Sequence, residues 1–207
     1  MTAADLFDDD PPDTRAAIMR ATYEALREHG YAGLTVQRIA DEFPKSKSLL
    51  YHHYDGKDDL LRDLLGYVLD HHRETVPAGD EESAPETRLR DLIDYVLTAD
   101  PDPERAAFRA AMVELRGQAA HDREYRDHFT ESDRFFQDRI AAVVGAGVDS
   151  GAFRDVDPDR VAAHVQTTFE GALVRSATAD SAAAIDAVRA DLHRYVDGCL
   201  LAEGAHE

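Results

Sequence analysis

The sequence predicts an all-α protein of about nine helices, with a three-helix unit at the N-terminus and a larger helical domain behind it. Apolar residues recur at three- and four-residue spacing along most of the 207 residues. Glycine and proline fall mainly between these periodic segments, where they mark turns. No segment shows the alternation that is typical of a half-buried strand, and no internal repeat is evident. Together these patterns favour a helical fold.

The N-terminal unit is expected to contain three helices after a short arm. Residues 1–12 end in three aspartates and two prolines, which is typical of a flexible, solvated acidic arm. The first helix begins after Asp13 or Thr14 and should end at Gly30. A second, short helix begins near Thr35. A third runs from about Ser46 to Tyr54, after the Phe43-Pro44 break.

The remaining helices are longer and carry broader apolar faces. A fourth helix follows the Asp55-Gly56 turn, and residues 77–86 have the composition of a loop or linker. Pro158 suits the first position of a helix, because its φ is already helical. Further helices are expected at about 88–98, 104–120, 123–147, 158–177 and 181–202.

The charge distribution matters more than the total of −19. A strongly acidic chain argues against a nucleic-acid partner, because DNA is a polyanion. However, all three lysines (Lys45, Lys47 and Lys57) lie within thirteen residues, and residues 13–62 are neutral, with eight basic and eight acidic side chains. An acidic, lysine-poor surface elsewhere is typical of proteins from a salt-rich cytoplasm, where screening weakens self-repulsion. The alternative is an acidic protein from ordinary salt.

The third helix gathers side chains that suit DNA contact. Lysine reaches phosphates or guanine edges, serine and tyrosine hydroxyls donate to phosphates, and histidine does either. Leu50 and Tyr54 should point back into the three-helix unit. A solvated charged helix is the alternative, but the concentration of lysine here favours DNA. The candidate DNA-binding residues are Thr35, Gln37, Arg38, Lys45, Ser46, Lys47, Ser48, Tyr51, His52 and Lys57.

The segment resembles the N-terminal signature of the TetR family of regulators over about residues 13–70. The matching positions are Gly30-Tyr31, Leu34-Thr35-Val36, Ile39-Ala40, Ser46, Leu50-Tyr51-His52-His53-Tyr54, Lys57 and Leu60. The resemblance implies a helix-turn-helix, at about residues 35–54, in a homodimeric repressor that a small ligand releases. By that resemblance Thr35 caps the second helix against a phosphate, Tyr51 contacts the DNA backbone, and Lys57 grips another phosphate.

Two positions depart from the family pattern. Pro44 and Lys45 stand where glycine and an apolar residue are usual in the turn. Proline cannot adopt the left-handed conformation that glycine supplies, so the turn must be built differently. Leu49 stands where a small or polar residue is usual, and base contact there is expected to be apolar.

The rest of the chain resembles the family's ligand domain more loosely. Glu114-Leu115, His121-Asp122, Tyr125-Arg126 and residues 151–158 are similar to a C-terminal variant that is also found in choline-responsive and drug-responsive relatives. The resemblance implies that the last two helices pair with their copies in a four-helix dimer interface. Their alanine content independently permits close approach. The candidate interface residues are Val165, Phe169, Leu173, Val188, Leu192 and Tyr195.

A cavity for the ligand is the least specific of these predictions. Phenylalanines 129, 135, 136, 153 and 169 lie at helical spacing, which is more often plain core than a cavity lining. The candidate ligand-binding residues are Glu114, His121, Tyr125, Phe136, Phe169 and Glu170. Adjacent histidines, as in His52-His53 and His71-His72, do not share a helix face, so neither a metal site nor a cofactor is expected.

These observations predict a DNA-binding transcriptional regulator, most simply a repressor that binds a palindromic operator as a homodimer. The predicted domains are an arm at 1–12, a DNA-binding domain at 13–58, and a ligand-binding and dimerisation domain at 59–207. A cytoplasmic location is expected, because no signal peptide or membrane span is evident. The alternatives are a helical protein-interaction scaffold without DNA binding and a small helical enzyme, although no catalytic motif appears.

Overall fold

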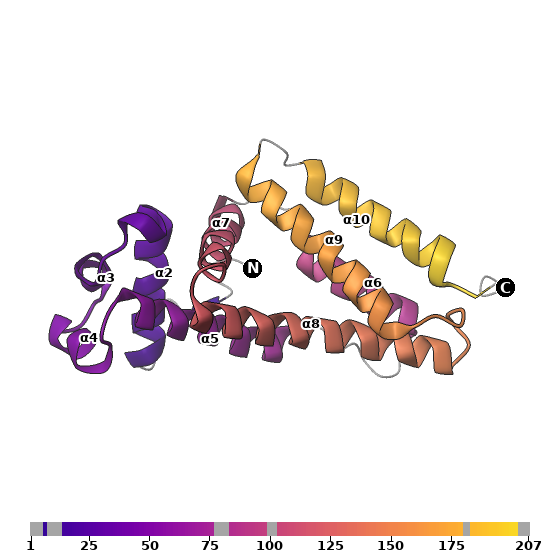
Figure 1. The fold of residues 1–207 in the computed structure, drawn as a ribbon, viewed down its shortest axis with the longest axis horizontal. Helices are drawn as coiled ribbons and strands as arrows, with labels where there is room; N and C mark the ends of the chain where they lie inside the picture. The colour runs from indigo at the N-terminus through magenta and orange to yellow at the C-terminus, as the bar shows by residue number, and fades with distance from the viewer. Residues whose placement is uncertain (1–5, 8–13, 77–82, 99–102, 180–182, 203–207) are drawn as a thin grey trace. The chain divides into compact units, whose positions relative to one another are not determined.

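The computed structural model describes residues 6–7, 14–76, 83–98, 103–179 and 183–202, and within them it contains nine α-helices and one isolated β-bridge (Figure 1). The predicted all-α fold is therefore confirmed. A turn of π-helix, Val196–Leu200, follows the last α-helix. The α-helices are α2 (Thr14–Gly33), α3 (Val36–Glu42), α4 (Lys47–His53), α5 (Lys57–Thr75), α6 (Pro85–Val96), α7 (Pro103–Gln118), α8 (Arg123–Asp149), α9 (Pro158–Thr178) and α10 (Ala183–Tyr195).

The chain packs as two units, each with its own core. The first unit comprises Met1–Glu74 and Pro101–Thr130, and the second comprises Thr75–Asp100 and Glu131–Glu207. This division differs from the predicted boundary between residues 58 and 59, because α7 and the start of α8 bury their apolar faces in the first core. Helical periodicity shows which side of a helix faces inward, but it does not show which core that side joins.

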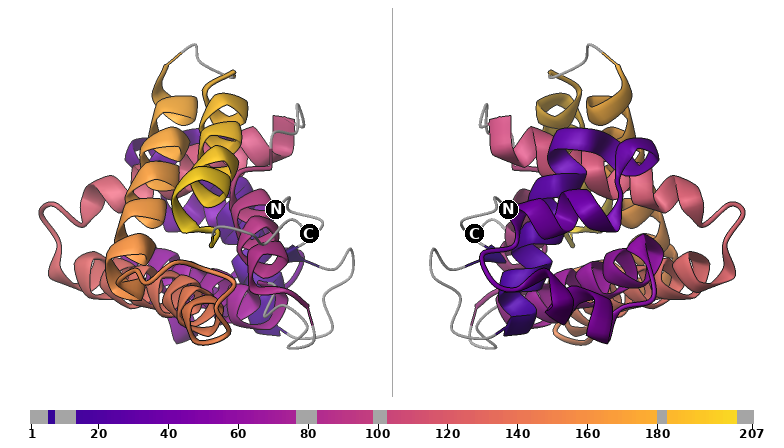
Figure 2. Two further views of the ribbon diagram at one scale, coloured as in Figure 1. Left: turned by 90° about the vertical axis from the view of Figure 1, so that its right-hand side faces the viewer. Right: turned by 90° about the vertical axis from the view of Figure 1, so that its left-hand side faces the viewer.

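The first unit is held together by one fully buried apolar cluster. Met19 and Leu26 of α2, Ile39 of α3, Leu50 of α4 and Leu60 of α5 all lie in it. These side chains come from the indigo-to-violet part of the ribbon, α2 to α5 (Figure 2). Each short helix contributes few apolar side chains, so α3 and α4 depend on tertiary packing rather than on their own helix propensity.

Two residues of the predicted arm belong to this core. Leu6 and Phe7 are buried, and the Phe7 ring lies 5.5 Å from the Tyr67 ring and 5.8 Å from the Tyr23 ring. The prediction of a free arm is therefore wrong at these two residues. The aspartates and prolines on which that prediction rested lie outside the described residues. An apolar pair next to an acidic run still gains free energy by leaving water.

The end of α2 depends on Gly30. Its φ of +63° interrupts the helical geometry, and one more turn continues to Gly33. A Cβ at residue 30 would lie 3.3 Å from a carboxylate oxygen of Glu114 on α7. The predicted helix break at Gly30 is confirmed, and the positive φ favours glycine there.

The second unit is built from α6, most of α8, α9 and α10. Figures 1 and 2 show α10 lying along α9, and α10 also contacts α6. The predicted start of α9 is confirmed, because the Asp157 side chain accepts from the backbone N–H of Asp159 (3.0 Å) and of Arg160 (3.3 Å), ahead of Pro158. These bonds satisfy donors that a helix N-terminus otherwise leaves free.

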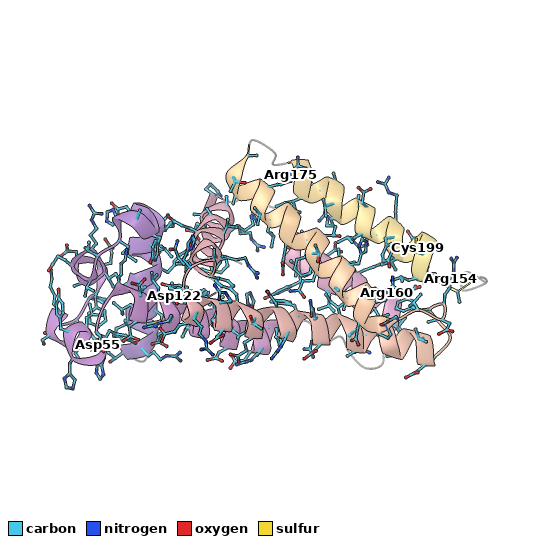
Figure 3. All side chains as sticks on the ribbon, in the orientation of Figure 1. Asp55, Asp122, Arg154, Arg160, Arg175 and Cys199 are labelled. Atoms are coloured by element: carbon cyan, nitrogen blue, oxygen red, sulfur yellow. The ribbon has the colours of Figure 1, made fainter. Side chains whose placement is uncertain are left out.

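The loop after α8 closes against the C-terminal turn. A Cβ at Gly147 would stand 2.1 Å from the Phe153 ring, so only glycine fits there. Arg154, labelled in Figure 3, donates from Nε to the Leu201 carbonyl at 2.8 Å. The loop and the last turn are thereby fixed to each other.

Candidate nucleic-acid interface and effector pocket

The second helix of the predicted motif, α3, is capped by Thr35. The Thr35 hydroxyl accepts from the backbone N–H of Arg38 at 3.2 Å. Ile39 and Ala40 are buried, whereas the Gln37 and Arg38 side chains are exposed on the opposite side. Thr35 therefore stabilises the N-terminus of α3, and its side chain is exposed. One face of α3 is fixed and the other is free to meet a partner.

The turn between α3 and α4 is made without any left-handed residue. Phe43 is buried with φ −80° and ψ 121°, an extended conformation that suits a residue before proline. Within the described residues, only Gly30 and Gly151 have positive φ. Pro44 therefore does not prevent the turn, and the expectation that the turn is built differently is confirmed.

The third helix of the motif, α4, presents one side to solvent. Leu50 is 0% exposed, whereas Tyr51 is 58% exposed. Leu49 is half-buried and packs against the core cluster, so it is less available for base contact than its position in the sequence suggested. The exposed side carries Lys45, Ser46, Lys47, Ser48, Tyr51 and His52.

In the free protein the three lysines make contacts within their own unit. Lys47 forms an ion pair with Asp41 of α3. Lys45 Nζ donates to the Thr14 hydroxyl at 3.3 Å. Lys57 Nζ donates to the Tyr31 carbonyl at 2.9 Å and lies 4.2 Å from the Tyr31 ring centroid. Hydrogen bonds from Lys47 and Gln37 hold the pKa of Asp41 below its usual value.

These contacts are not equally easy to exchange for DNA. The Lys47–Asp41 pair is exposed on both sides, and such pairs are weak. Lys57 is half-buried and combines a hydrogen bond with a cation–π contact. Lys47 is thus held only by an exposed ion pair, whereas Lys57 is partly committed to the end of α2.

Asp58, which the sequence reasoning missed, accepts two tyrosine hydroxyls in the first unit. The Tyr31 and Tyr125 hydroxyls both donate to Oδ1 of Asp58, at 2.9 Å and 3.1 Å. Burial, followed by the hydrogen bond to Asp58, raises the pKa of Tyr31 to about 12. Burial likewise raises the pKa of Tyr125. The partners of Asp58 are 27 and 67 positions away, so no local pattern reveals the cluster.

A second aspartate of α5 holds the other end of the motif. Asp63 accepts from Arg15 Nη2 of α2 at 2.7 Å and from the Tyr54 hydroxyl just after α4. Burial raises the pKa of Tyr54, and so does the bond to Asp63. Asp58 and Asp63 therefore tie α2, α4 and α8 to the start of α5, and together they position the exposed side of α4.

Three predicted ligand-binding residues lie in this first unit. Tyr125 is 1% exposed with its hydroxyl on Asp58, and Glu114 stands beside Gly30. His121 is exposed in the turn between α7 and α8. None of the three lines the pocket described next. A polar residue in or beside a long helix does not by itself distinguish a ligand site from a structural contact.

The second unit contains a small apolar pocket between α6, α8 and α9. Its free volume is about 10 Å³, which is room for roughly one water molecule. Two predicted ligand-binding residues, Phe136 and Phe169, lie on its wall with ring centroids 6.4 Å apart. Glu170 does not line it. The lining residues are Leu89, Leu92, Ile93, Val96, Phe136, Arg139, Ile140, Val165 and Phe169.

The other phenylalanines of the stripe are core residues. Phe129 belongs to the core of the first unit, and Phe153 packs in the core of the second. Phe135 is half-buried against that second core. The question left open by the sequence is thus answered residue by residue: two of the five rings line a pocket and three pack elsewhere.

The six predicted dimer-interface residues lie at different depths within the protomer. Val165, Phe169 and Leu192 are already buried within one protomer, so they offer no surface to a partner. Three others are half-buried against the same core, namely Leu173, Val188 and Tyr195. Apolar periodicity selected the inward face of each helix. The outward face of α9 instead carries Ala163, His164, Thr167, Gly171 and Val174.

Among the described residues, no three histidine, cysteine, aspartate or glutamate side chains cluster as metal ligands. No described helix has the length and apolar character to cross a bilayer.

The sequence matches two family profiles. Residues 18–64 match that of the bacterial regulatory proteins of the TetR family, and residues 85–201 match the C-terminal part of BetI-type transcriptional repressors. The second match covers more than half of the chain. The first match spans α3, α4 and the start of α5, which carry the exposed candidate residues.

Curated relatives include transcriptional repressors. The HTH-type transcriptional repressor AcnR of Corynebacterium efficiens is 27% identical over 174 residues, covering 84% of this chain and 87% of AcnR. The repressor SCO4008 of Streptomyces coelicolor is 28% identical, covering 72% of each chain.

Solved structures support the same family assignment. At least one of them is similar enough to this chain in sequence to indicate a shared family. A TetR transcription regulator from Haloarcula marismortui is 36% identical with a TM-score of 0.82, covering 90% of this chain and 97% of its own. A regulator from Saccharomonospora viridis in complex with choline is 19% identical with a TM-score of 0.80, covering 91% and 98%, and it shows the shared fold. The exposed α4, the family profiles and these relatives lead to one conclusion: the chain belongs to the TetR family and is a DNA-binding transcriptional repressor.

Proposed function

We propose that this repressor binds a palindromic operator as a homodimer through the exposed side of α3 and α4, and that a small molecule bound in its second unit releases it. The observation that supports this proposal best is the two-sided character of α4. Leu50 is fully buried and anchors the helix, while Tyr51 and Lys47 face solvent. A short helix held on one side and polar on the other suits insertion into a major groove.

The roles of the individual side chains follow from their chemistry. Lys47 and Lys45 bind phosphates once they exchange their present partners, and Tyr51 contacts the DNA backbone. Ser46, Ser48 and His52 lie on the same side and supply donors for phosphates or base edges. Gln37 and Arg38 extend this surface from α3, and Thr35 places the N-terminus of α3 near a phosphate. Lys57 contributes one further phosphate contact.

Dimerisation is assigned to the outward faces of α9 and α10. Ala163, Thr167, Gly171 and Val174 recur at helical spacing on α9 and present little side-chain bulk. Small residues of this kind let two helices approach closely. A two-fold axis here would repeat α4 in two half-sites roughly 34–36 Å apart, or somewhat more, along the duplex.

We infer that the protein acts in the cytoplasm, where DNA is accessible. Its acidic surface suits a cytoplasm with a high salt concentration. It needs no catalytic activity for this role. The scaffold alternative would leave the lysines without a purpose, since they are confined to the motif. Which gene the bound protein represses depends on where the operator lies.

A DNA-binding titration tests the proposal. Fluorescence anisotropy with DNA from upstream of the protein's own gene should show saturable binding that weakens as salt rises. Lys47→Ala should weaken binding and lower the salt slope by about 0.9, which corresponds to one lost phosphate contact. The matched control is Arg134→Ala, which removes an exposed cation on α8 in the second unit. A folded dimer that does not bind this DNA would contradict the assignment. An unchanged salt dependence of DNA binding for Lys47→Ala would also contradict it.

A further inference from the structure

The pocket of the second unit has a single charged wall residue among the described residues. Four residues of α6 (Leu89, Leu92, Ile93 and Val96) form one apolar side, and the Phe136 and Phe169 rings form another. Arg139 of α8 is the one lining residue that is not apolar. An arginine on an apolar wall costs free energy unless its donors are bonded, because its charge is then taken from water.

Arg139 is only partly satisfied. Its Nη2 donates to the carbonyl of Val76 at 3.2 Å. Its Nε is shielded from solvent and has no hydrogen-bond partner, and no carboxylate pairs with Arg139 among the described residues. A guanidinium carries five N–H donors in a planar fork that fits a carboxylate by two parallel bonds. The Arg139 guanidinium can therefore bind an anionic group of an external ligand.

The pocket is poorly equipped for a cation. None of its wall residues is acidic. The nearest candidate from the sequence, Glu170, does not line it, and its Oε1 accepts from Gln166 Nε2 at 2.7 Å. A cationic ligand would be attracted by the faces of the two phenyl rings but repelled by a guanidinium of the same sign. The charge of the wall disfavours quaternary ammonium ligands such as the choline held by the Saccharomonospora viridis neighbour.

We propose that the effector of this repressor is a small carboxylate with an apolar body, held by Arg139 at its charged end and by the Phe136 and Phe169 rings along its body. The inference rests on the proposed ligand-released function and specifies its ligand. The apolar body fits walls of leucine, isoleucine and phenylalanine. The carboxylate satisfies the Nε donor that Arg139 leaves without a partner.

The same contact suggests how binding reaches the DNA-binding motif. Val76, whose carbonyl accepts a hydrogen bond from Arg139, directly follows α5. The other end of α5 begins at Lys57, shortly after α4. A bound carboxylate competes with that carbonyl for the guanidinium and frees the end of α5. Because the present volume is about 10 Å³, any organic ligand must also part the walls. The ligand therefore stabilises an opened state, which is what release of DNA requires.

Three isosteric probes test the charge preference. Benzoate, benzamide and benzamidine share one shape and carry a negative, a neutral and a positive group. Titration calorimetry of the full-length protein should give the lowest Kd for benzoate, by about 10-fold or more over benzamide, with benzamidine the weakest. A Kd for benzamide or benzamidine equal to or lower than that for benzoate would overturn the proposal.

Variants assign the effect to Arg139. Arg139→Gln should raise the benzoate Kd to the level of benzamide, and Arg139→Lys should give an intermediate value, because lysine keeps the charge and loses the fork. Arg134→Gln, an exposed arginine on the same helix, should bind benzoate as the wild type does. Unchanged benzoate binding by a folded Arg139→Gln would refute the assignment. If that variant does not fold, Arg139→Lys and the three-probe comparison decide.

DNA binding is measured separately, so the two proposals fail separately. The ligand-free wild type must retain operator DNA if the proposed function is right. Benzoate at saturation should then weaken that complex, whereas benzamide at the same concentration should not. Loss of benzoate selectivity with intact DNA binding would refute only the ligand class, and selective benzoate binding without any DNA binding would refute only the regulator.

Discussion

In the first unit partly buried tyrosine hydroxyls on two aspartates, together with the buried Leu50, hold the DNA-facing helix in place, whereas in the second unit apolar side chains surround a pocket with one arginine. Hydrogen bonds are directional and lose their value over small displacements. Apolar packing tolerates rearrangement if volume is kept. The first unit is thus built to keep α4 in one position, and the second is built to change its packing around a ligand.

The largest expected effect breaks the first unit at its apolar anchor. Leu50→Ala removes the fully buried side chain that fixes α4. The free energy of unfolding should fall by roughly 2–5 kcal/mol, because the cavity adds to the lost transfer energy. Thermal unfolding followed by circular dichroism measures this change. Tyr51→Ala on the exposed side should alter stability by less than about 0.5 kcal/mol and weaken DNA binding instead. Equal stability losses would show that α4 is not anchored as described.

A comparable change in the second unit is Gly147→Ala. The new Cβ would meet the Phe153 ring at 2.1 Å, so the ring and its loop must move. Overpacking of this kind costs about 1–3 kcal/mol. The control is Gly66→Ala on α5, where nothing lies within 4 Å of the new atom, so stability should rise by up to about 1 kcal/mol. Chemical denaturation compares the two variants. A neutral Gly147→Ala would mean that the loop after α8 repacks freely.

Alkaline pH should weaken the first unit through its tyrosines. Unfolded Tyr31 ionises near its ordinary pKa of 10.0, whereas burial and the bond to Asp58 raise its folded pKa to about 12. Its contribution to stability is complete below pH 10 and is lost as pH rises to about 12, because only the unfolded state then releases the proton. Thermal melts from pH 9 to 12 should fall less steeply for Tyr31→Phe than for the wild type. Parallel slopes would show that the Tyr31 hydroxyl does not stay protonated on Asp58.

How much of this comparison the sequence predicts depends on how local each feature is. Helix positions, the start of α9 at Pro158 and the exposed side of α4 follow from spacing within a few residues, and the structure agrees with them. The Asp58 cluster and the role of Arg139 depend on partners 27 to 67 positions away, which periodicity cannot supply. Three of the predicted dimer residues, Val165, Phe169 and Leu192, lie in the protomer's own core for a related reason: each helix has one strongly apolar face, and that face packs inward.

The smallest expected effect sharpens the description of the DNA-facing surface. Asp41→Asn removes the carboxylate that pairs with Lys47 in the free protein and would face phosphate in the complex. An exposed pair is weak, so stability should change little. Operator binding should tighten by about 2- to 5-fold at low salt, and the gain should shrink as salt screens the lost repulsion. Anisotropy titrations at two salt concentrations measure both effects. The control is Glu42→Gln on the same helix, which removes the same charge without releasing Lys47. If Asp41→Asn binds DNA more weakly than the wild type, the carboxylate positions Lys47 for its phosphate, and the ion pair belongs to the bound state.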